Sequence, residues 1–203
     1  MTGAVGLAPG DTARRIVEIA MALIQTRGYS AISYQDISDC LAIRKASIHY
    51  HFPSKTDLGI AAVEAYSAAL RAHLDAVVGD QSADTVALFE RYCEPFRGLA
   101  ATPDKVCLCG ALAGEILALP EAMRPIVKNF FAMHEAWLEA MLARGIARGE
   151  VPKAIDPAGA ARLIFSALQG ALLVRRTTDD RDQVEDVIRT IRAQFFAPPR
   201  IQK

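Results

Sequence analysis

Residues 31–58 read AISYQDISDCLAIRKASIHYHFPSKTDL, and this stretch decides the fold. Ser33 stands three residues before Asp36, which is the spacing of a helix capping box and predicts a short helix over residues 34–41. A second short helix is predicted at about residues 45–51. The few residues between the two helices leave room only for a tight turn. Two helices of this length around such a turn have the dimensions of a helix-turn-helix.

A longer helical pattern precedes this stretch. It opens at Asp11-Thr12, either of which can cap a helix, and it places apolar side chains three and four residues apart on one face. It ends at Arg27-Gly28, the cation and glycine that are typical of a helix C-terminus. We therefore expect three helices in an N-terminal head.

Another helix is predicted to follow the head. Pro53 disfavours helical backbone at the residue before it, and Ser54 with Asp57 forms a second capping pattern. Apolar positions then continue at helical spacing to about Gly79. A helix of that length would span about 35 Å at a rise of 1.5 Å per residue, so it would be a stiff connector.

The remainder of the chain also reads as helical. Apolar periodicity is found at about residues 83–100, 105–118, 120–148, 157–176 and 181–196, without a strand pattern or a repeat. The expected fold is all-α, with a three-helix helix-turn-helix head joined by a long fourth helix to a helical bundle. The expected organisation is a disordered N-terminus over residues 1–10, a head over 11–58, a connector helix over about 54–79 and a bundle domain over 80–198.

The composition agrees with a globular helical chain. Of 203 residues, 52% are hydrophobic and 23% are charged, which excludes a disordered chain or a fibre, and 23 Lys and Arg balance 23 Asp and Glu, which excludes a polyelectrolyte. No uncharged run approaches the length of a membrane span, and MTGAVGLAPG lacks the basic start of a secretory signal, so we expect a cytoplasmic protein that does not contact membranes. In that setting the four cysteines are expected to be thiols, namely Cys40, Cys93, Cys107 and Cys109.

Positive charge is concentrated at the second short helix and its flanks. Residues 40–56 contain Arg44, Lys45, Lys55 and two histidines but no acidic residue. On a helix that begins near Lys45, Ile48 would pack inward and the polar side chains would face outward. Such side chains suit base edges and phosphates of DNA, although spacing alone equally allows a solvated face of a structural bundle.

The head resembles the DNA-binding head of the TetR family of bacterial transcriptional repressors. The resemblance covers about residues 11–66 and rests on the His-Tyr-His-Phe element at 49–52, followed by Lys55, in register with both preceding helices. The family usually has Gly-Val in the turn, where this chain has Ala42-Ile43, and we expect Ala42 to adopt helical backbone angles. The resemblance implies a double-stranded DNA operator as partner and contacts from Gln35, Arg44, Lys45, Ala46, Ser47, His49, Tyr50, His51 and Lys55, of which Tyr50, His51 and Lys55 would meet phosphates.

The resemblance also implies a homodimer. A single short reading helix makes few contacts, so specificity requires two heads on two half-sites. The last two helices carry apolar stripes that would build a four-helix interface, although such stripes can also be buried within one chain. The predicted interface residues are Leu163, Ala167, Leu168, Ala171, Val184, Val187, Ile188 and Ile191.

The sequence offers no signature of an enzyme. It contains no GxSxG, HExxH, P-loop or GxGxxG motif, and its four histidines do not have a metal-ligand spacing. We expect no catalytic residue, no metal and no cofactor. The family resemblance instead implies a small-molecule effector that changes the spacing of the two heads through the fourth helix.

An effector pocket is predicted in the bundle, where bulky and small apolar residues alternate, although such a pattern is also typical of a packed core. Cys107-Leu108-Cys109-Gly110 begins a predicted helix close to Lys105, a setting that lowers a thiol pKa. It resembles a TetR subgroup in which a cysteine senses electrophiles or oxidants, but Val106 replaces the glycine before that cysteine, and an inert buried thiol is the alternative. The predicted pocket residues are Cys107, Phe131, His134 and Trp137.

The sequence therefore predicts a cytoplasmic regulator without catalytic activity that binds a palindromic operator as a dimer, most simply a repressor released by a ligand. Two alternatives stay open. One is a repressor that senses redox or electrophilic compounds through Cys107. The other is a helical interaction protein that does not bind DNA.

Overall fold

The computed structural model describes residues 9–79, 82–102 and 104–196. This part of the chain is helical and contains no strand, which confirms the predicted fold class. The elements are α1 (Pro9–Arg27), α2 (Tyr34–Leu41), α3 (Lys45–His51), α4 (Lys55–Gly79), α5 (Thr85–Ala100), α6 (Leu108–Gly114), the 3₁₀ turn η1 (Glu121–Met123), α7 (Arg124–Arg148), α8 (Pro157–Thr178) and α9 (Gln183–Phe195).

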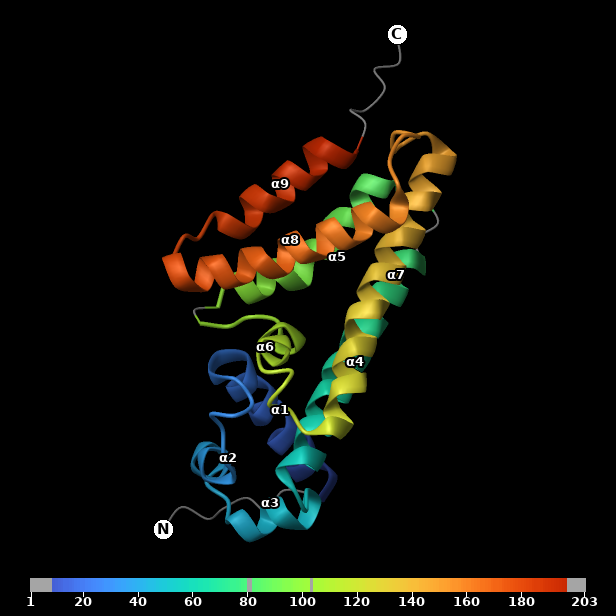
Figure 1. Cartoon of the computed structure of the whole chain (residues 1–203). Helices are drawn as coiled ribbons and strands as arrows, with labels where there is room; N and C mark the ends of the chain where they lie inside the picture. Colours follow the sequence, from blue (N-terminus) through green and yellow to red (C-terminus); the bar gives the residue numbers. More distant parts are fainter. Residues whose placement is uncertain (1–8, 80–81, 103, 197–203) are drawn as a thin grey trace.

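The helices form a small head and a larger bundle (Figure 1). α1, α2 and α3 lie at one end, and α4 leaves the head and runs alongside α7. α5, α8 and α9 pack together at the other end, and α6 lies between them and the head. α4 and α6 therefore connect the head to the bundle.

The head is held by local caps and a small apolar core. Ser33 and Asp36 form a complete capping box at α2, and the Ser54 hydroxyl and backbone N–H both donate to the Asp57 carboxylate before α4. The Tyr34 hydroxyl donates to the Phe52 carbonyl over 2.8 Å and ties α2 to the end of α3. The core of the head consists of fully buried side chains from each helix, including Ile16, Ile24, Ile37, Ile48 and Leu58.

Three predicted boundaries differ from the structure. α1 begins at Pro9, before the predicted cap, and the predicted disorder of residues 1–8 lies outside the described residues. α6 covers only 108–114 of the predicted helix 105–118, because the chain turns after Gly114 through hydrogen bonds three residues apart. The predicted helix 120–148 begins as the turn η1, and α7 starts only at Arg124.

The turn of the helix-turn-helix corrects one expectation. Ala42 has φ 52° and ψ 38°, in the left-handed region, and not the helical angles expected for it. The turn is held there because the Ile43 N–H donates to the Ser38 carbonyl and the Ser38 hydroxyl donates back to the Ile43 carbonyl over 2.6 Å. The turn therefore has the left-handed conformation that glycine usually adopts, and Ala42 is strained in it.

Ala42→Gly is expected to raise the free energy of unfolding by about 1 kcal/mol, because glycine adopts left-handed angles without the penalty of a Cβ. Urea denaturation of the wild type and the variant measures the difference. Ala65→Gly, at an exposed position inside α4, is the matched control and is expected to lose about 0.5–1 kcal/mol. Equal destabilisation by both substitutions would contradict a strained Ala42.

The residues predicted for the dimer interface differ in how far they are buried within the chain. Leu168, Ala171, Val184, Ile188 and Ile191 are buried within the chain, where α8 packs against α7 and α9, and they are not free for a second copy. Leu163 is 58% exposed, whereas Ala167 and Val187 are half-buried. The other exposed apolar side chains of α8 are Leu173 and Val174, which the sequence pattern did not single out.

α8 has the length and apolar composition of a membrane-crossing helix. Such a composition is also expected of a helix at the centre of a bundle, and α8 packs against α5, α7 and α9. Its apolar residues occupy both a face that is buried in the chain and a face that is not.

Candidate nucleic-acid interface and its link to the bundle

α3 presents an exposed polar face at the end of the head. Ile48 is fully buried and fixes the helix on the core, so Lys45, Ala46 and Ser47 face outward. Tyr50 is 81% exposed, which is unusual for a large aromatic side chain. These residues are all exposed on α3, so they are accessible to a partner outside the head.

Three other residues that were predicted to contact DNA lie on α2 or at the two ends of α3, namely Gln35, Arg44 and His49. Arg44 is the exposed N-cap of α3, and Gln35 is exposed on α2, where its amide donates to the Asp39 carboxylate. His49 is exposed with its ring edge-on to Tyr34 at a centroid distance of 4.6 Å. These side chains are therefore accessible, and each is oriented by a neighbour or by the helix start.

Lys55 and His51 are held more closely by the head. The Lys55 ammonium lies 4.5 Å from the centre of the Tyr29 ring and 3.4 Å from the Ser30 carbonyl. Burial lowers the pKa of Lys55, and the nearby Glu115 carboxylate opposes that shift. His51 is half-buried, with its ring edge-on to Tyr50. Both residues brace the end of α3 and the start of α4.

The carboxylates of the head lie outside α3. Hydrogen bonds from Ser33 lower the pKa of Asp36, and its carboxylate accepts from Arg27 over 3.2 Å. The face made by residues 44–50 carries cations and hydroxyls but no acid. A short helix with this chemistry fits the width of a DNA major groove and can donate hydrogen bonds to bases and phosphates.

Glu115 joins the head to the bundle. Its two carboxylate oxygens accept the backbone N–H groups of Tyr29 and Ser30, each over 2.8 Å, across 86 and 85 residues of sequence. Gly28 stands at the end of α1 with φ 86°, and a Cβ there would lie 2.1 Å from Oε1 of Glu115. Two features therefore require glycine at position 28. Its φ angle is positive, and the Glu115 carboxylate leaves no space for a Cβ.

Further contacts hold the end of α1 to the bundle. The Arg176 guanidinium of α8 donates to the Thr26 carbonyl over 2.7 Å. The Val106 N–H, just before α6, donates to the Gln25 carbonyl over 3.3 Å. With Glu115 these bonds attach the last turn of α1 to three separate parts of the bundle. A movement of α6 would therefore shift the head through these hydrogen bonds.

An aromatic cluster fills the centre of the bundle. The Tyr92 hydroxyl and Nδ1 of His134 share a hydrogen bond of 2.7 Å, and the His134 ring stacks on Phe165 at a centroid distance of 4.3 Å. Trp137 stacks on Tyr92, and Phe131 contacts Phe165 edge-on. Burial lowers the pKa of His134 to about 3, so the imidazole is neutral at physiological pH.

The neutral His134 is expected to make the protein less stable in acid. In the unfolded chain His134 takes up a proton near pH 6.5, and in the folded chain only near pH 3. Between these values the unfolded state therefore binds more protons than the folded state. The free energy of unfolding falls as the pH falls through this range. At pH 4.5 the loss amounts to about 2–3 kcal/mol. Comparing urea denaturation at pH 7 and pH 4.5 for the wild type and for His134→Asn, whose amide keeps a hydrogen-bonding group for Tyr92 but does not titrate, isolates this share. An equal pH dependence in both proteins would count against a buried neutral imidazole.

The four predicted pocket residues belong to the core of the bundle, and none of the pockets described for residues 9–79, 82–102 and 104–196 is lined by all four. Phe131 lines a groove of about 700 Å³ between α6 and α7, and Trp137 lines a second groove of about 640 Å³ between α4 and α7. His134 is buried and lines neither groove. Burial, together with the nearby Cys107 thiol, raises the pKa of the Tyr66 hydroxyl of α4.

Several contributors to this interior were missed in the sequence. Phe165 and Gln169 lie on α8, where the sequence pattern singled out neither of them, and the Gln169 amide oxygen lies against Gly110 of α6. Side-chain atoms of Ser67, Trp137 and Gln169 are buried without a hydrogen-bond partner in the described part of the chain. Unpaired buried polar atoms of this kind are usual where a ligand supplies the missing bonds.

The cysteines are mostly buried thiols. Cys107 is the N-cap of α6, as expected from its place at a helix start, but it is only 3% exposed. Burial raises the pKa of Cys93 and of Cys109, and Cys40 is exposed. A buried thiol is poorly placed to meet an electrophile. Within the described ranges, no three His, Cys, Asp or Glu side chains gather as metal ligands.

Comparison with known proteins places both parts of the chain in one family. Residues 16–62 match the bacterial regulatory proteins of the tetR family, and residues 78–191 match the tetracyclin repressor-like C-terminal domain. Transcriptional regulator AcuR of Cereibacter sphaeroides is 26% identical over 184 residues, which cover 89% of this chain and 83% of that protein.

Solved structures agree with these matches. A TetR-family transcriptional regulator from Agrobacterium tumefaciens is 32% identical, with a TM-score of 0.88 over 94% of this chain and 100% of the other. A TetR transcriptional regulator from Legionella pneumophila is 31% identical, with a TM-score of 0.82 over 91% of this chain and 97% of the other.

Proposed function

Because the chain belongs to the TetR family of DNA-binding transcriptional regulators, which are not enzymes, we propose that it is a repressor that binds a palindromic operator as a homodimer. The observation that carries this proposal is the exposed, acid-free face of α3 around Lys45 and Tyr50. A regulator of bacterial genes acts beside the chromosome, so we place it in the cytoplasm.

The apolar surface left on α8 supports the dimer. Leu163, Ala167, Gly170 and Val174 follow one another at steps of three and four residues, so they lie on one face of the helix. The face combines exposed leucine and valine with small residues that allow two helices to approach closely. A second copy related by a two-fold axis would cover this face with its own α8.

Leu163→Glu combined with Val174→Glu is expected to weaken dimerisation at least a hundredfold, because two copies would each bury two unpaired carboxylates. Light scattering at micromolar concentration is expected to show a dimer for the wild type and a monomer for the variant. Leu117→Glu is the matched control, since Leu117 is 87% exposed outside this face, and it should remain dimeric. A monomeric wild type, or a dimeric variant, would refute this interface.

The groove between α6 and α7 is our proposed effector site. Its lining is mostly apolar, with Phe131 and Ile116 on the walls and Lys128 at the rim, which suits a small, largely apolar molecule. An effector seated there bears on α6, whose end carries Glu115. Displacement of α6 would pull this carboxylate away from Tyr29 and Ser30 and alter the placement of the head.

Selection from a random duplex library tests the proposed function. The protein should be unfolded and refolded first, so that a retained effector does not mask DNA binding. The expected product is a palindromic sequence bound with an affinity that falls steeply with salt. Failure of the refolded dimer to enrich any sequence would overturn the proposal and favour the interaction-protein alternative.

A further inference from the structure

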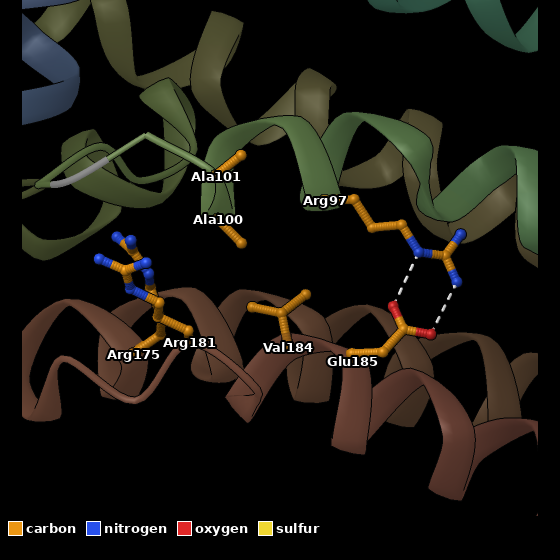
Figure 2. A pocket seen from close by; sticks show the side chains of 7 residues that line it. All are labelled: Arg97, Ala100, Ala101, Arg175, Arg181, Val184 and Glu185. Atoms are coloured by element: carbon orange, nitrogen blue, oxygen red, sulfur yellow. Dashed lines mark hydrogen bonds and ion pairs between the residues drawn. The ribbon is translucent and has the colours of Figure 1, made fainter.

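A further pocket lies in the bundle, between α5, α8 and α9 (Figure 2). Its volume is about 360 Å³. It shares no lining residue with the groove between α6 and α7. The side chains that line it are Arg97, Ala100, Ala101, Arg175, Arg181, Val184 and Glu185.

One of the three arginines is already neutralised. Nε of Arg97 lies 2.8 Å from one Glu185 oxygen and Nη2 lies 3.2 Å from the other. Nη2 also donates to the Glu90 carboxylate over 2.7 Å. Figure 2 shows the paired contact at one end of the pocket. The single carboxylate of the lining is therefore committed to Arg97.

The other two arginines have no carboxylate partner in the described part of the chain. Arg175 is only 8% exposed, and its one hydrogen bond there runs from Nη1 to the Thr102 carbonyl over 3.1 Å. Its Nε is buried without a partner. Arg181 lines the same pocket, and Figure 2 shows both side chains at the end of the pocket away from Arg97 and Glu185.

This arrangement is costly in an empty pocket. A guanidinium that is removed from water without a counter-ion loses hydration that one carbonyl does not replace. A second cation beside it adds repulsion. Both costs are removed by an anion that bridges Arg175 and Arg181, and the alanines of α5 leave space for one.

We propose that this pocket binds a small phosphate-bearing metabolite, with its phosphate held between Arg175 and Arg181. The planar guanidinium fork matches two oxygens of a phosphate, and two forks match its double negative charge. The pocket is larger than one phosphate requires, so the bound molecule carries a further small group, which lies toward Val184 and the Arg97–Glu185 pair. This site is separate from the proposed effector groove and does not depend on it.

Isothermal titration of the dimer with inorganic phosphate, pyrophosphate and succinate, at constant ionic strength in chloride, tests the proposal. We expect saturable binding of phosphate or pyrophosphate, one per chain, and at least tenfold weaker binding by Arg181→Gln. Arg189→Gln, an exposed arginine of α9 outside the pocket, is the charge-matched control and should bind like the wild type. Arg175→Met should abolish binding, but the exposed Arg181 carries the test if that variant does not fold.

Three results would overturn the proposal. The first is absence of saturable binding by the wild type. The second is equal binding by Arg181→Gln and the wild type, which would place the anion elsewhere. The third is binding of succinate but of neither phosphate compound, which would assign the pocket to dicarboxylates.

Discussion

Tyr50→Ala is expected to weaken operator binding by about 2–6 kcal/mol, a loss of roughly 30-fold to more than 10⁴-fold. The side chain is almost fully exposed on α3, so its contacts are free for DNA, and a dimer loses two of them, each worth about 1–3 kcal/mol. The same exposure means that the substitution should leave the thermal stability unchanged. Fluorescence anisotropy with the selected duplex, over a series of salt concentrations, measures the change.

Two companion variants separate the contributions of the ring, the hydroxyl and the charge. Tyr50→Phe keeps the ring and should lose only part of the affinity. Lys45→Ala should also reduce the dependence on salt, because each dimer gives up two cationic contacts, whereas Lys153→Ala, in an exposed loop of the bundle, should not. Unchanged affinity for both Tyr50→Ala and Lys45→Ala would show that α3 is not the reading helix.

Gly28→Ala is expected to lower the free energy of unfolding by about 3–5 kcal/mol. About 1–2 kcal/mol comes from a left-handed alanine at φ 86°. The rest comes from the new Cβ, which would lie 2.1 Å from a Glu115 oxygen and displace the carboxylate that accepts the Tyr29 and Ser30 N–H groups. Urea denaturation of the wild type and the variant gives this difference.

A double-mutant cycle with Glu115→Ala assigns the cost. Once the carboxylate is removed, Gly28→Ala should cost only the backbone strain of about 1–2 kcal/mol. The two substitutions should therefore be strongly non-additive. Additive losses would mean that Glu115 does not press on Gly28, and the proposed path from α6 to the head would lose its main contact.

Local signals explain why the head was predictable. The bounds of α2 and α3 agree with the expected ranges because Ser33 and Asp36 fix the first start by a capping box and Pro53 limits the second helix. Ala42 is where local reasoning failed. Its own preference favours helical angles, but the hydrogen bonds between Ser38 and Ile43 impose the left-handed turn.

The link between head and bundle could not be predicted, because it depends on contacts between residues far apart in sequence. Glu115 read as part of a helix, whereas in the structure it follows α6 and binds backbone 85 residues away. Arg175 falls inside the helix that the sequence predicts over about residues 157–176, and nothing in the sequence pattern singles it out. Only the packing of α5 and α9 shows that Arg175 is buried and that it lines one pocket with Arg181.

Periodicity also could not show which apolar residues of α8 are buried within the chain and which are exposed. Leu168 and Leu163 are both leucines at helical spacing from their neighbours, yet the first is fully buried in the chain and the second is exposed. A stripe at a spacing of three and four residues shows that a face is buried, but not whether its own chain or a second copy buries it. The residues available for a dimer therefore emerge only from the structure.

In the function that we propose, two heads held in one rigid dimer read two half-sites on the same side of the DNA. Inserting base pairs between the half-sites of the selected operator tests this most directly. An insertion of about five base pairs turns one half-site to the opposite side of the duplex, because one turn holds about 10–10.5 base pairs. We expect this insertion to lower the affinity of the dimer for the operator at least a hundredfold. Equal affinity for the original and the inserted duplex would contradict it.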